Sequence, residues 1–162
     1  MQGGTGSLSI QQDMPDFLPD RGEAGTVNVP GICGLAAGMA HIRHVGLKAI
    51  AAREEREAMR AAQGLAGLGL RVFTGPHQAG VLSFLPPDGD CETAAERFAA
   101  RGVALRAGVH CAPTAHESAG TLETGTVRAS FGPDASPEQT RGFLQTAAAL
   151  WGGKTGQKVA RM

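Results

Sequence analysis

Residues 69–85 read Gly-Leu-Arg-Val-Phe-Thr-Gly-Pro-His-Gln-Ala-Gly-Val-Leu-Ser-Phe-Leu. Two short β-prone runs, 70–73 and 80–85, flank a turn-prone segment that contains Gly75 and Pro76. Apolar and aromatic residues in short runs bounded by Gly and Pro are typical of strands. The stretch therefore predicts two neighbouring strands, and with them the start of a small sheet.

Upstream of these runs the apolar residues return at helical spacing. From Pro30 they share one helix face, and Gly46 ends that helix; the face is formed by Ile32, Leu35, Ala36, Met39 and Ala40. A second helix begins at Leu47, and its apolar face holds Leu47, Ile50, Ala51, Ala58, Ala61, Ala62 and Leu65. We interpret the charged run Arg53-Glu54-Glu55-Arg56-Glu57 as the solvated side of this second helix.

Downstream the pattern alternates between helix and strand. The sequence predicts a helix over 90–101, with Ala94, Ala95, Phe98 and Ala99 inward and Gly102 as its C-terminal cap. It then predicts a strand over 103–106, a loop over 108–111 and a strand over 125–131. A last helix is predicted from the cap Ser136 to Trp151. The buried stripe of the last helix is predicted to be Phe143, Ala147, Leu150 and Trp151. This order predicts an α/β fold, a two-layer sandwich in which helices pack on a small, mostly antiparallel sheet.

The two ends of the chain differ from its middle. Residues 1–31 carry Gly, Pro, Asp and Gln without a sustained period, and we expect an extended loop that packs on a large domain outside this chain. Residues 32–151 form the predicted small domain, and 152–162 a flexible, polar, basic tail.

Composition excludes several classes of function. The 162 residues carry 15 basic and 15 acidic side chains, so no general attraction to nucleic acid or to an anionic membrane is expected. The three cysteines, Cys33, Cys91 and Cys111, form no Cys-x-x-Cys pair, and neither a signal peptide nor a long apolar run is present. We expect a cytoplasmic protein with reduced thiols.

Cys111 is the main candidate for chemistry. It lies in Arg106-Ala107-Gly108-Val109-His110-Cys111-Ala112-Pro113, and Gly125-Thr126-Val127-Arg128-Ala129-Ser130 follows. A partly exposed thiol beside Arg or His is where a nucleophilic thiolate forms, and two arginines can hold a carboxylate. Free cysteine is also among the most buried residue types, so a small buried hydrophobe is the other reading.

The neighbours of Cys111 have plainer interpretations. On an extended segment His110 would point away from Cys111, which favours a structural role over proton transfer. We expect Arg106 to brace the loop and His116 to lie on the surface. His110, Cys111 and His116 lack a fourth ligand and match no common zinc pattern, so no metal site is predicted.

Five ordered motifs carry a resemblance to a known family. They are Gly3-Gly4-Thr5-Gly6-Ser7, Glu23-Ala24-Gly25-Thr26-Val27-Asn28, Gly31-Ile32-Cys33-Gly34-Leu35, residues 106–112 and residues 125–130. In this order the chain resembles, over residues 3–150, the C-terminal small domain of a fold-type I, class V pyridoxal-phosphate enzyme of the cysteine desulfurase and selenocysteine lyase family.

The resemblance implies roles for single residues. Cys111 would take sulfur from substrate cysteine as a persulfide and release alanine, and Arg128 would hold the substrate carboxylate. Arg106 and His110 would border the amino-acid substrate. Thr26 would contact the cofactor phosphate of a partner subunit in a homodimer, with Thr5 and Gly4 close to the same region. A sulfur-accepting protein is a further implied partner.

One departure from the family concerns the cofactor. The family holds pyridoxal 5'-phosphate on a lysine that follows a histidine and precedes the Gly-Gly-Thr-Gly-Ser run, whereas Lys48, Lys154 and Lys158 have no preceding His. We therefore expect a chain that is inactive without a large domain, whether as a gene fragment or as half of a split enzyme. Two other readings stay open: a persulfide carrier without enzymatic activity, and an interaction module that pairs with a full-length homologue.

Overall fold

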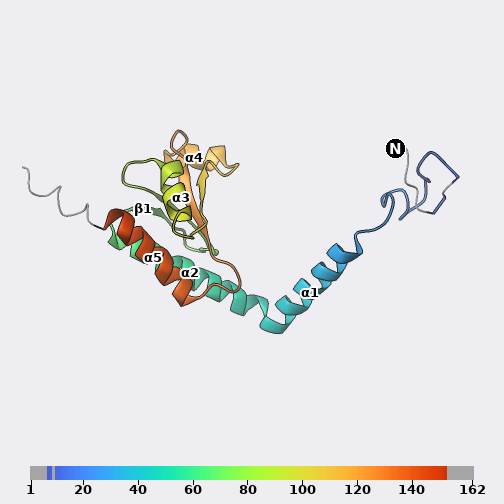
Figure 1. The fold of residues 1–162 in the computed structure, drawn as a ribbon, viewed down its shortest axis with the longest axis horizontal. Coiled ribbons are helices and arrows are strands. Elements are labelled where there is room, and N and C mark those ends of the chain that lie inside the picture. The colour runs from blue at the N-terminus through green and yellow to red at the C-terminus, as the bar shows by residue number, and fades with distance from the viewer. Residues whose placement is uncertain (1–6, 9, 153–162) are drawn as a thin grey trace, which may run out of the picture. The chain divides into compact units, whose positions relative to one another are not determined.

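The computed structural model describes residues 7–8 and 10–152. The chain forms two compact units, Met1–Val45 and Gly46–Met162 (Figure 1). In the part of the chain that is described, no helix is long and apolar enough to cross a membrane.

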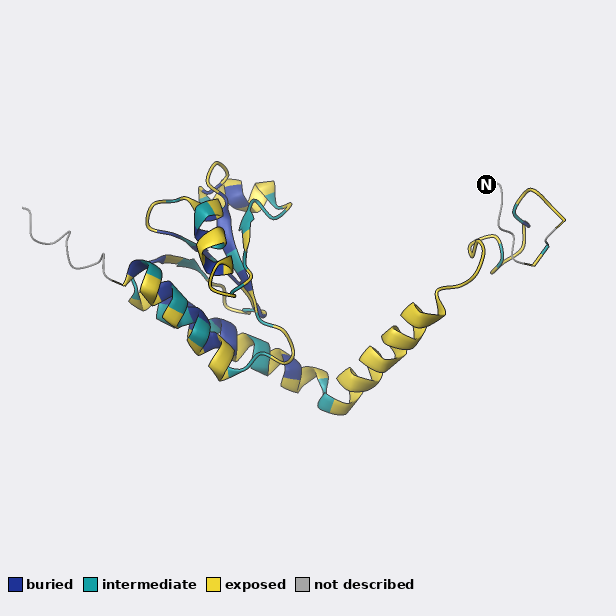
Figure 2. Ribbon diagram, viewed as in Figure 1, coloured by how far each residue is buried: buried dark blue, intermediate teal, exposed yellow. Residues whose placement is uncertain are grey.

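The first unit holds one helix, α1 (Val29–Val45). Asn28 caps this helix, because its side-chain oxygen accepts a hydrogen bond of 3.0 Å from the backbone N–H of Gly31. No residue of α1 is buried, and even Leu35 is 66% exposed (Figure 2). The predicted apolar face therefore exists along this helix, but none of the described residues of the first unit buries it.

The second unit is built on an antiparallel sheet, as predicted. Its strands are β1 (Arg71–Phe73), β2 (Val81–Leu85), β3 (Arg106–Gly108) and β4 (Thr126–Ser130), in the order β1-β2-β4-β3. All three neighbouring pairs are antiparallel. Successive side chains point to opposite faces, so Val127 and Ala129 lie on one face of β4, and Thr126 and Arg128 on the other.

Three helices cover the face that carries Val127. They are α2 (Leu47–Gly67), α3 (Cys91–Ala99) and α5 (Pro137–Trp151). The core between helices and sheet is aromatic, with Phe84 in edge-to-face contact with Phe98, Phe143 and Trp151. Such pairs add about 0.5–1.5 kcal/mol each to the burial of their area. These helices bury the face of the sheet that carries Val127, and they leave uncovered the opposite face, which carries Thr126 and Arg128.

A fourth helix in the second unit, α4 (Pro113–Ala119), was not predicted. Pro113 begins it, and Gly120 ends it in the left-handed conformation. A cavity of about 160 Å³ lies between it and the sheet, lined by Phe73, Ser83, Ala115, His116, Ala119, Thr121 and Thr126. Helix α4 therefore covers one end of the face that α2, α3 and α5 leave open.

The strand predicted over 103–106 lies instead at Arg106–Gly108. Helix α3 ends in a Schellman motif, in which the N–H of Gly102 donates to Ala99 and the N–H of Val103 donates to Phe98. Since Val103 is bound to the helix end, pairing with β4 begins only at Arg106. Gly102 is confirmed as the cap, with φ of 78°, but the predicted inward Ala99 is exposed.

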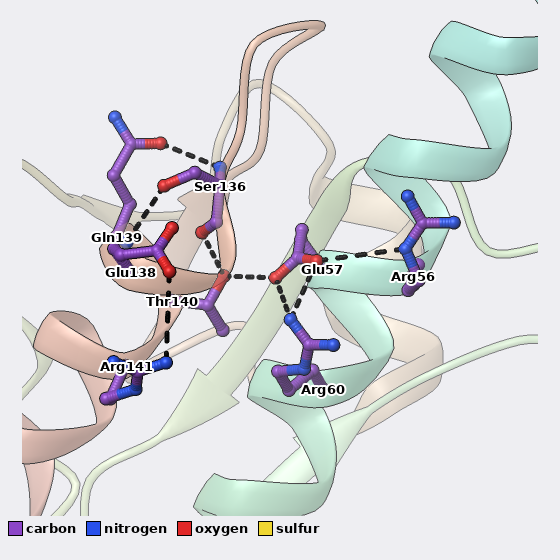
Figure 3. A network of polar contacts seen from close by, with 8 residues as sticks. All are labelled: Arg56, Glu57, Arg60, Ser136, Glu138, Gln139, Thr140 and Arg141. Carbon is purple, nitrogen blue, oxygen red and sulfur yellow. Dashed lines mark hydrogen bonds and ion pairs between the residues drawn. The ribbon is translucent and has the colours of Figure 1, made fainter.

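Helix α2 is confirmed, but two details of its faces were wrong. Leu47 and Ala51, expected on the buried face, are exposed. Glu57, expected in the solvated run, is only 1% exposed. Its carboxylate accepts two hydrogen bonds of 2.8 Å from Arg60 and one of 2.8 Å from Thr140 of α5 (Figure 3). A buried carboxylate is tolerated here because its oxygens have these donors.

Candidate functional site

The loop between β3 and α4 carries Cys111 in an unusual backbone conformation. His110 and Cys111 have φ of 54° and 59°, and both lie in the left-handed region. The loop leaves the sheet where two glycines meet, since a Cβ on Gly125 would lie 2.7 Å from the carbonyl carbon of Gly108. A larger residue at Gly125 would push β3 and β4 apart, so this glycine fixes where the loop starts.

Cys111 is exposed, which rules out its reading as a small buried hydrophobe. Cys91 has that role instead: it is 3% exposed and belongs to the core. Burial raises the pKa of the Cys91 thiol, with Asp90 and Asp88 adding to the effect. Cys111 is therefore accessible to a substrate, whereas Cys91 is not.

Two arginines face each other across β3 and β4. Arg106 pairs with Arg128 in the register, and Ser83 of β2 lies on the other side of Arg128. Directly opposed like charges repel at this separation. The Nε of Arg128 is buried and has no hydrogen-bond partner in the described part of the chain. A buried, unpaired guanidinium N–H beside a second arginine is an arrangement that an anion would complete.

His110 lies beside this pair of arginines. Its Nε2 is 3.1 Å from the backbone oxygen of Thr126, and its Nδ1 is buried without a partner among the residues described. Burial lowers the pKa of His110, and electrostatic interactions with Arg128, His116 and Arg106 lower it further, against the hydrogen bond to Thr126. His110 is therefore neutral at neutral pH.

His116 is buried rather than on the surface, contrary to expectation. It is 7% exposed, and its Nδ1 lies 2.9 Å from the hydroxyl oxygen of Thr121. Its ring centroid is 5.9 Å from that of His110. The hydroxyl of Thr126, a residue that is 3% exposed, is a third buried polar atom without a partner in the described chain. Thr121 had no signal in the sequence, and Thr126 had none beyond its place in the Gly-Thr-Val-Arg strand.

A second cavity does not coincide with these groups. It measures about 580 Å³ and lies at the other end of β4, lined by residues 102–105 and 129–135 together with Gln139, Gly142 and Phe143. The three unpartnered buried side-chain atoms of the described chain all belong to His110, Thr126 and Arg128. The polar groups that could bind a ligand are therefore at the Cys111 end.

Three predicted site residues lie outside the second unit or outside the described residues. Thr26 is exposed in the first unit, and Gly4 and Thr5 lie outside the described residues. Within the described ranges, no three His, Cys, Asp or Glu side chains are grouped as a metal site requires.

The family model Aminotransferase class-V matches residues 1–143. The chain belongs to this family. It is 40% identical over 126 residues to a cysteine desulfurase of Synechococcus elongatus, and 35% identical over 130 residues to a probable cysteine desulfurase of Pyrococcus abyssi. These matches cover 76% and 78% of this chain but 20% and 32% of the relatives, so the chain spans only a fraction of their length.

Solved structures of the family share the fold. The apo cysteine desulfurase of Thermococcus onnurineus superposes with a TM-score of 0.73 at 31% identity, over 94% of this chain and 39% of that one. A cysteine desulfurase of Escherichia coli gives 0.72 at 27% identity, over 92% and 37%. The resemblance drawn from the five motifs is thereby confirmed at the level of family and fold.

Proposed function

We propose that this chain supplies the thiol and the carboxylate-binding groups of a cysteine desulfurase-like active site. The observation that carries the proposal is the exposed Cys111 one loop away from two opposed arginines, of which Arg128 has a buried, unpaired Nε. In this site Arg128 binds the substrate carboxylate, and Arg106 and His110 border the substrate. The similarity to cysteine desulfurases supports this assignment.

The proposed reaction converts L-cysteine and the Cys111 thiol into L-alanine and a Cys111 persulfide. The Cys111 thiolate attacks the substrate sulfur, a sulfur–sulfur bond forms, and the substrate carbon–sulfur bond breaks. The substrate carbon gains a hydrogen and is reduced, while sulfur is oxidised to the persulfide level. A sulfur-accepting protein then removes the outer sulfur and regenerates the thiol.

The family implies pyridoxal 5'-phosphate, and the described residues offer only part of its site. Lys48 is the one lysine among them, and it lies on α2, which packs against the sheet face opposite to Arg128. No lysine of the described chain therefore stands beside Cys111 to form a Schiff base.

We further propose how the chain takes part in the whole enzyme. Residues 1–31 would pack on a large domain that carries the cofactor lysine, 32–151 would act as the small domain, and Thr26, Thr5 and Gly4 would approach the cofactor phosphate across a homodimer. The uncovered apolar face of α1 is consistent with a need for such a domain. The chain alone would then be inactive.

The test replaces the matching 126 residues of the Synechococcus elongatus relative with this chain. We expect the chimera to bind the cofactor, to form alanine from L-cysteine, and to gain one sulfur atom on Cys111 by intact mass. The matched control is the same chimera with Cys111→Ala, which should keep the cofactor absorbance and lose alanine formation. A chimera that binds the cofactor but forms no alanine would contradict the proposal.

Exposure of Cys111 also suits a persulfide carrier without activity of its own. The two functions separate on incubation of the chain alone with an active cysteine desulfurase and L-cysteine. A carrier accumulates sulfur on Cys111 catalytically and passes it on. A small domain of an enzyme does not gain sulfur faster than its exposed Cys33.

A further inference from the structure

The backbone at His110 and Cys111 needs an explanation in the structure. Two consecutive residues other than glycine lie in the left-handed region, with φ of 54° and 59°. Each side chain in this conformation crowds its own carbonyl, so the conformation persists only where surrounding contacts hold it. Some contact must therefore fix this loop.

The backbone hydrogen bonds of the loop are local. The N–H of Ala112 donates to Val109 over 3.0 Å, and the N–H of His116 donates to Ala112 over 3.1 Å. Both bonds lie between the end of β3 and the first turn of α4, so neither one connects the loop to β4.

The His110 side chain makes that connection. A carbonyl oxygen can only accept, so the 3.1 Å contact with Thr126 requires the proton on Nε2. The acceptor belongs to the strand that carries Arg128 two residues later. Its Nδ1 is buried and has no partner in the described chain, so it takes no part in this connection.

We propose that His110 is the positioning residue of Cys111: as the neutral Nε2–H tautomer it ties the loop to β4 and holds the thiol in its exposed, left-handed position. This inference rests on the proposed function only in assigning Cys111 as the nucleophile. It assigns His110 to the placement of the thiol, whereas Arg128 binds the substrate. The charged and titratable groups that face His110 are Arg106 of β3, Arg128 of β4 and His116 of α4.

The first measurement is the tautomer of His110 in the intact chain, by nitrogen and carbon NMR of the imidazole at neutral pH. The proposal requires the Nε2–H form. A predominant Nδ1–H form, or an equal mixture of the two tautomers, would overturn it. This measurement needs no enzymatic activity, so it does not depend on whether the chain belongs to a desulfurase.

The second measurement compares His110→Ala with His110→Gln, because the glutamine amide can place an N–H where Nε2 stands. We expect hydrogen exchange at the amide of Ala112 to be about tenfold faster in His110→Ala, as loss of one hydrogen bond predicts, and to recover in His110→Gln. The control His77→Ala, at an exposed loop position, should leave exchange unchanged. Equal exchange in all variants would refute the proposed tie between His110 and β4. If His110→Ala does not fold, the tautomer of His110 and the exchange rates of His110→Gln still test the proposal.

In the chimera described above, His110→Ala is expected to lower kcat while KM for L-cysteine stays unchanged, and His110→Gln to restore kcat. A rise in KM alone would mean that His110 contacts the substrate instead. An inactive parent chimera would reject the proposed function but would leave the tautomer and exchange results standing.

Discussion

Arg106 and Arg128 stand opposite each other on neighbouring strands, and this placement disfavours the folded chain. Like charges directly across an antiparallel pair cost stability, and the buried Nε of Arg128 adds an unpaired donor. An anion bound between the two guanidinium groups would relieve both costs at once, in line with the proposed role of Arg128.

Removing one of the two charges should therefore stabilise the chain. We expect Arg106→Gln to raise the free energy of unfolding by about 0.2–1 kcal/mol, measured by urea denaturation at low salt. The gain should shrink as salt screens the pair. Lys48→Gln, an exposed position on α2, is the control and should change stability by less than about 0.5 kcal/mol. A destabilised Arg106→Gln would show that the two guanidiniums do not oppose each other.

The three cysteines should differ in their rates of alkylation. Cys111 and Cys33 are exposed, whereas burial raises the pKa of Cys91. At about pH 8, iodoacetamide should modify Cys111 and Cys33 before Cys91, because alkylation requires an accessible thiolate. Peptide mass mapping over time gives the order, and early modification of Cys91 in the folded chain would contradict the structure.

At the scale of elements, Glu57 connects two helices that are far apart in sequence. Its carboxylate accepts from Arg60 on its own helix and from Thr140 on α5 (Figure 3). The exposed pair Glu138–Arg141 on α5 is its natural comparison, with a separation of 3.9 Å and both side chains in solvent. Buried and exposed ion pairs of this kind contribute very differently to stability.

We expect Thr140→Val to lower the free energy of unfolding by about 1–3 kcal/mol, because a buried carboxylate loses one donor. Glu138→Ala should change it by less than about 1 kcal/mol, as is usual for an exposed ion pair. Urea denaturation of both variants checks the difference. Equal effects would mean that Glu57 is solvated after all.

The elements that could be predicted are those whose signals are local. Ser136 and Gln139 exchange side-chain hydrogen bonds with each other's backbone as a capping box, and the four residues that specify it are adjacent in sequence. The Schellman end of α3 is equally local. Helix α4 has only seven residues, too few for a periodic pattern, and it was missed.

What could not be predicted depends on contacts between distant segments. The burial of Glu57 requires Thr140, which lies 83 positions later, and the burial of His116 requires the sheet beneath α4. The thiol, the arginines and their strand were predicted from residue chemistry. The left-handed loop was not, because it depends on the contact between Gly108 and Gly125 and on the bond from His110 to Thr126.

The chain combines a second unit that has a packed core with a first unit whose helix α1 is not buried by the described residues. The aromatic core fixes three helices on one face of the sheet, while no residue of α1 is buried. Since large exposed apolar faces mark interaction sites, the exposed face of α1 supports the proposal that a further domain packs on the first unit. The second unit carries the reactive residues, and its stability can be measured without that partner.

That stability should depend on pH through His110. Burial lowers the pKa of His110 in the folded chain, so between this value and the ordinary value near 6.5 the unfolded chain binds more protons. The contribution of neutral His110 is thus complete above about pH 6.5 and is lost as the pH falls toward the folded pKa. Protonation would place an N–H on the buried Nδ1, beside Arg128 and Arg106, with no acceptor in the described chain.

The measurement compares the free energy of unfolding of the wild-type chain with that of His110→Gln, by urea denaturation between about pH 8 and about pH 5. The wild-type chain should lose stability relative to the variant as the pH falls, by at most about 1.4 kcal/mol per pH unit, because one group titrates. Other titrating groups cancel in this difference, since both proteins carry them. A difference that stays constant, or that grows in favour of the wild type in acid, would mean that His110 is not held neutral by the fold.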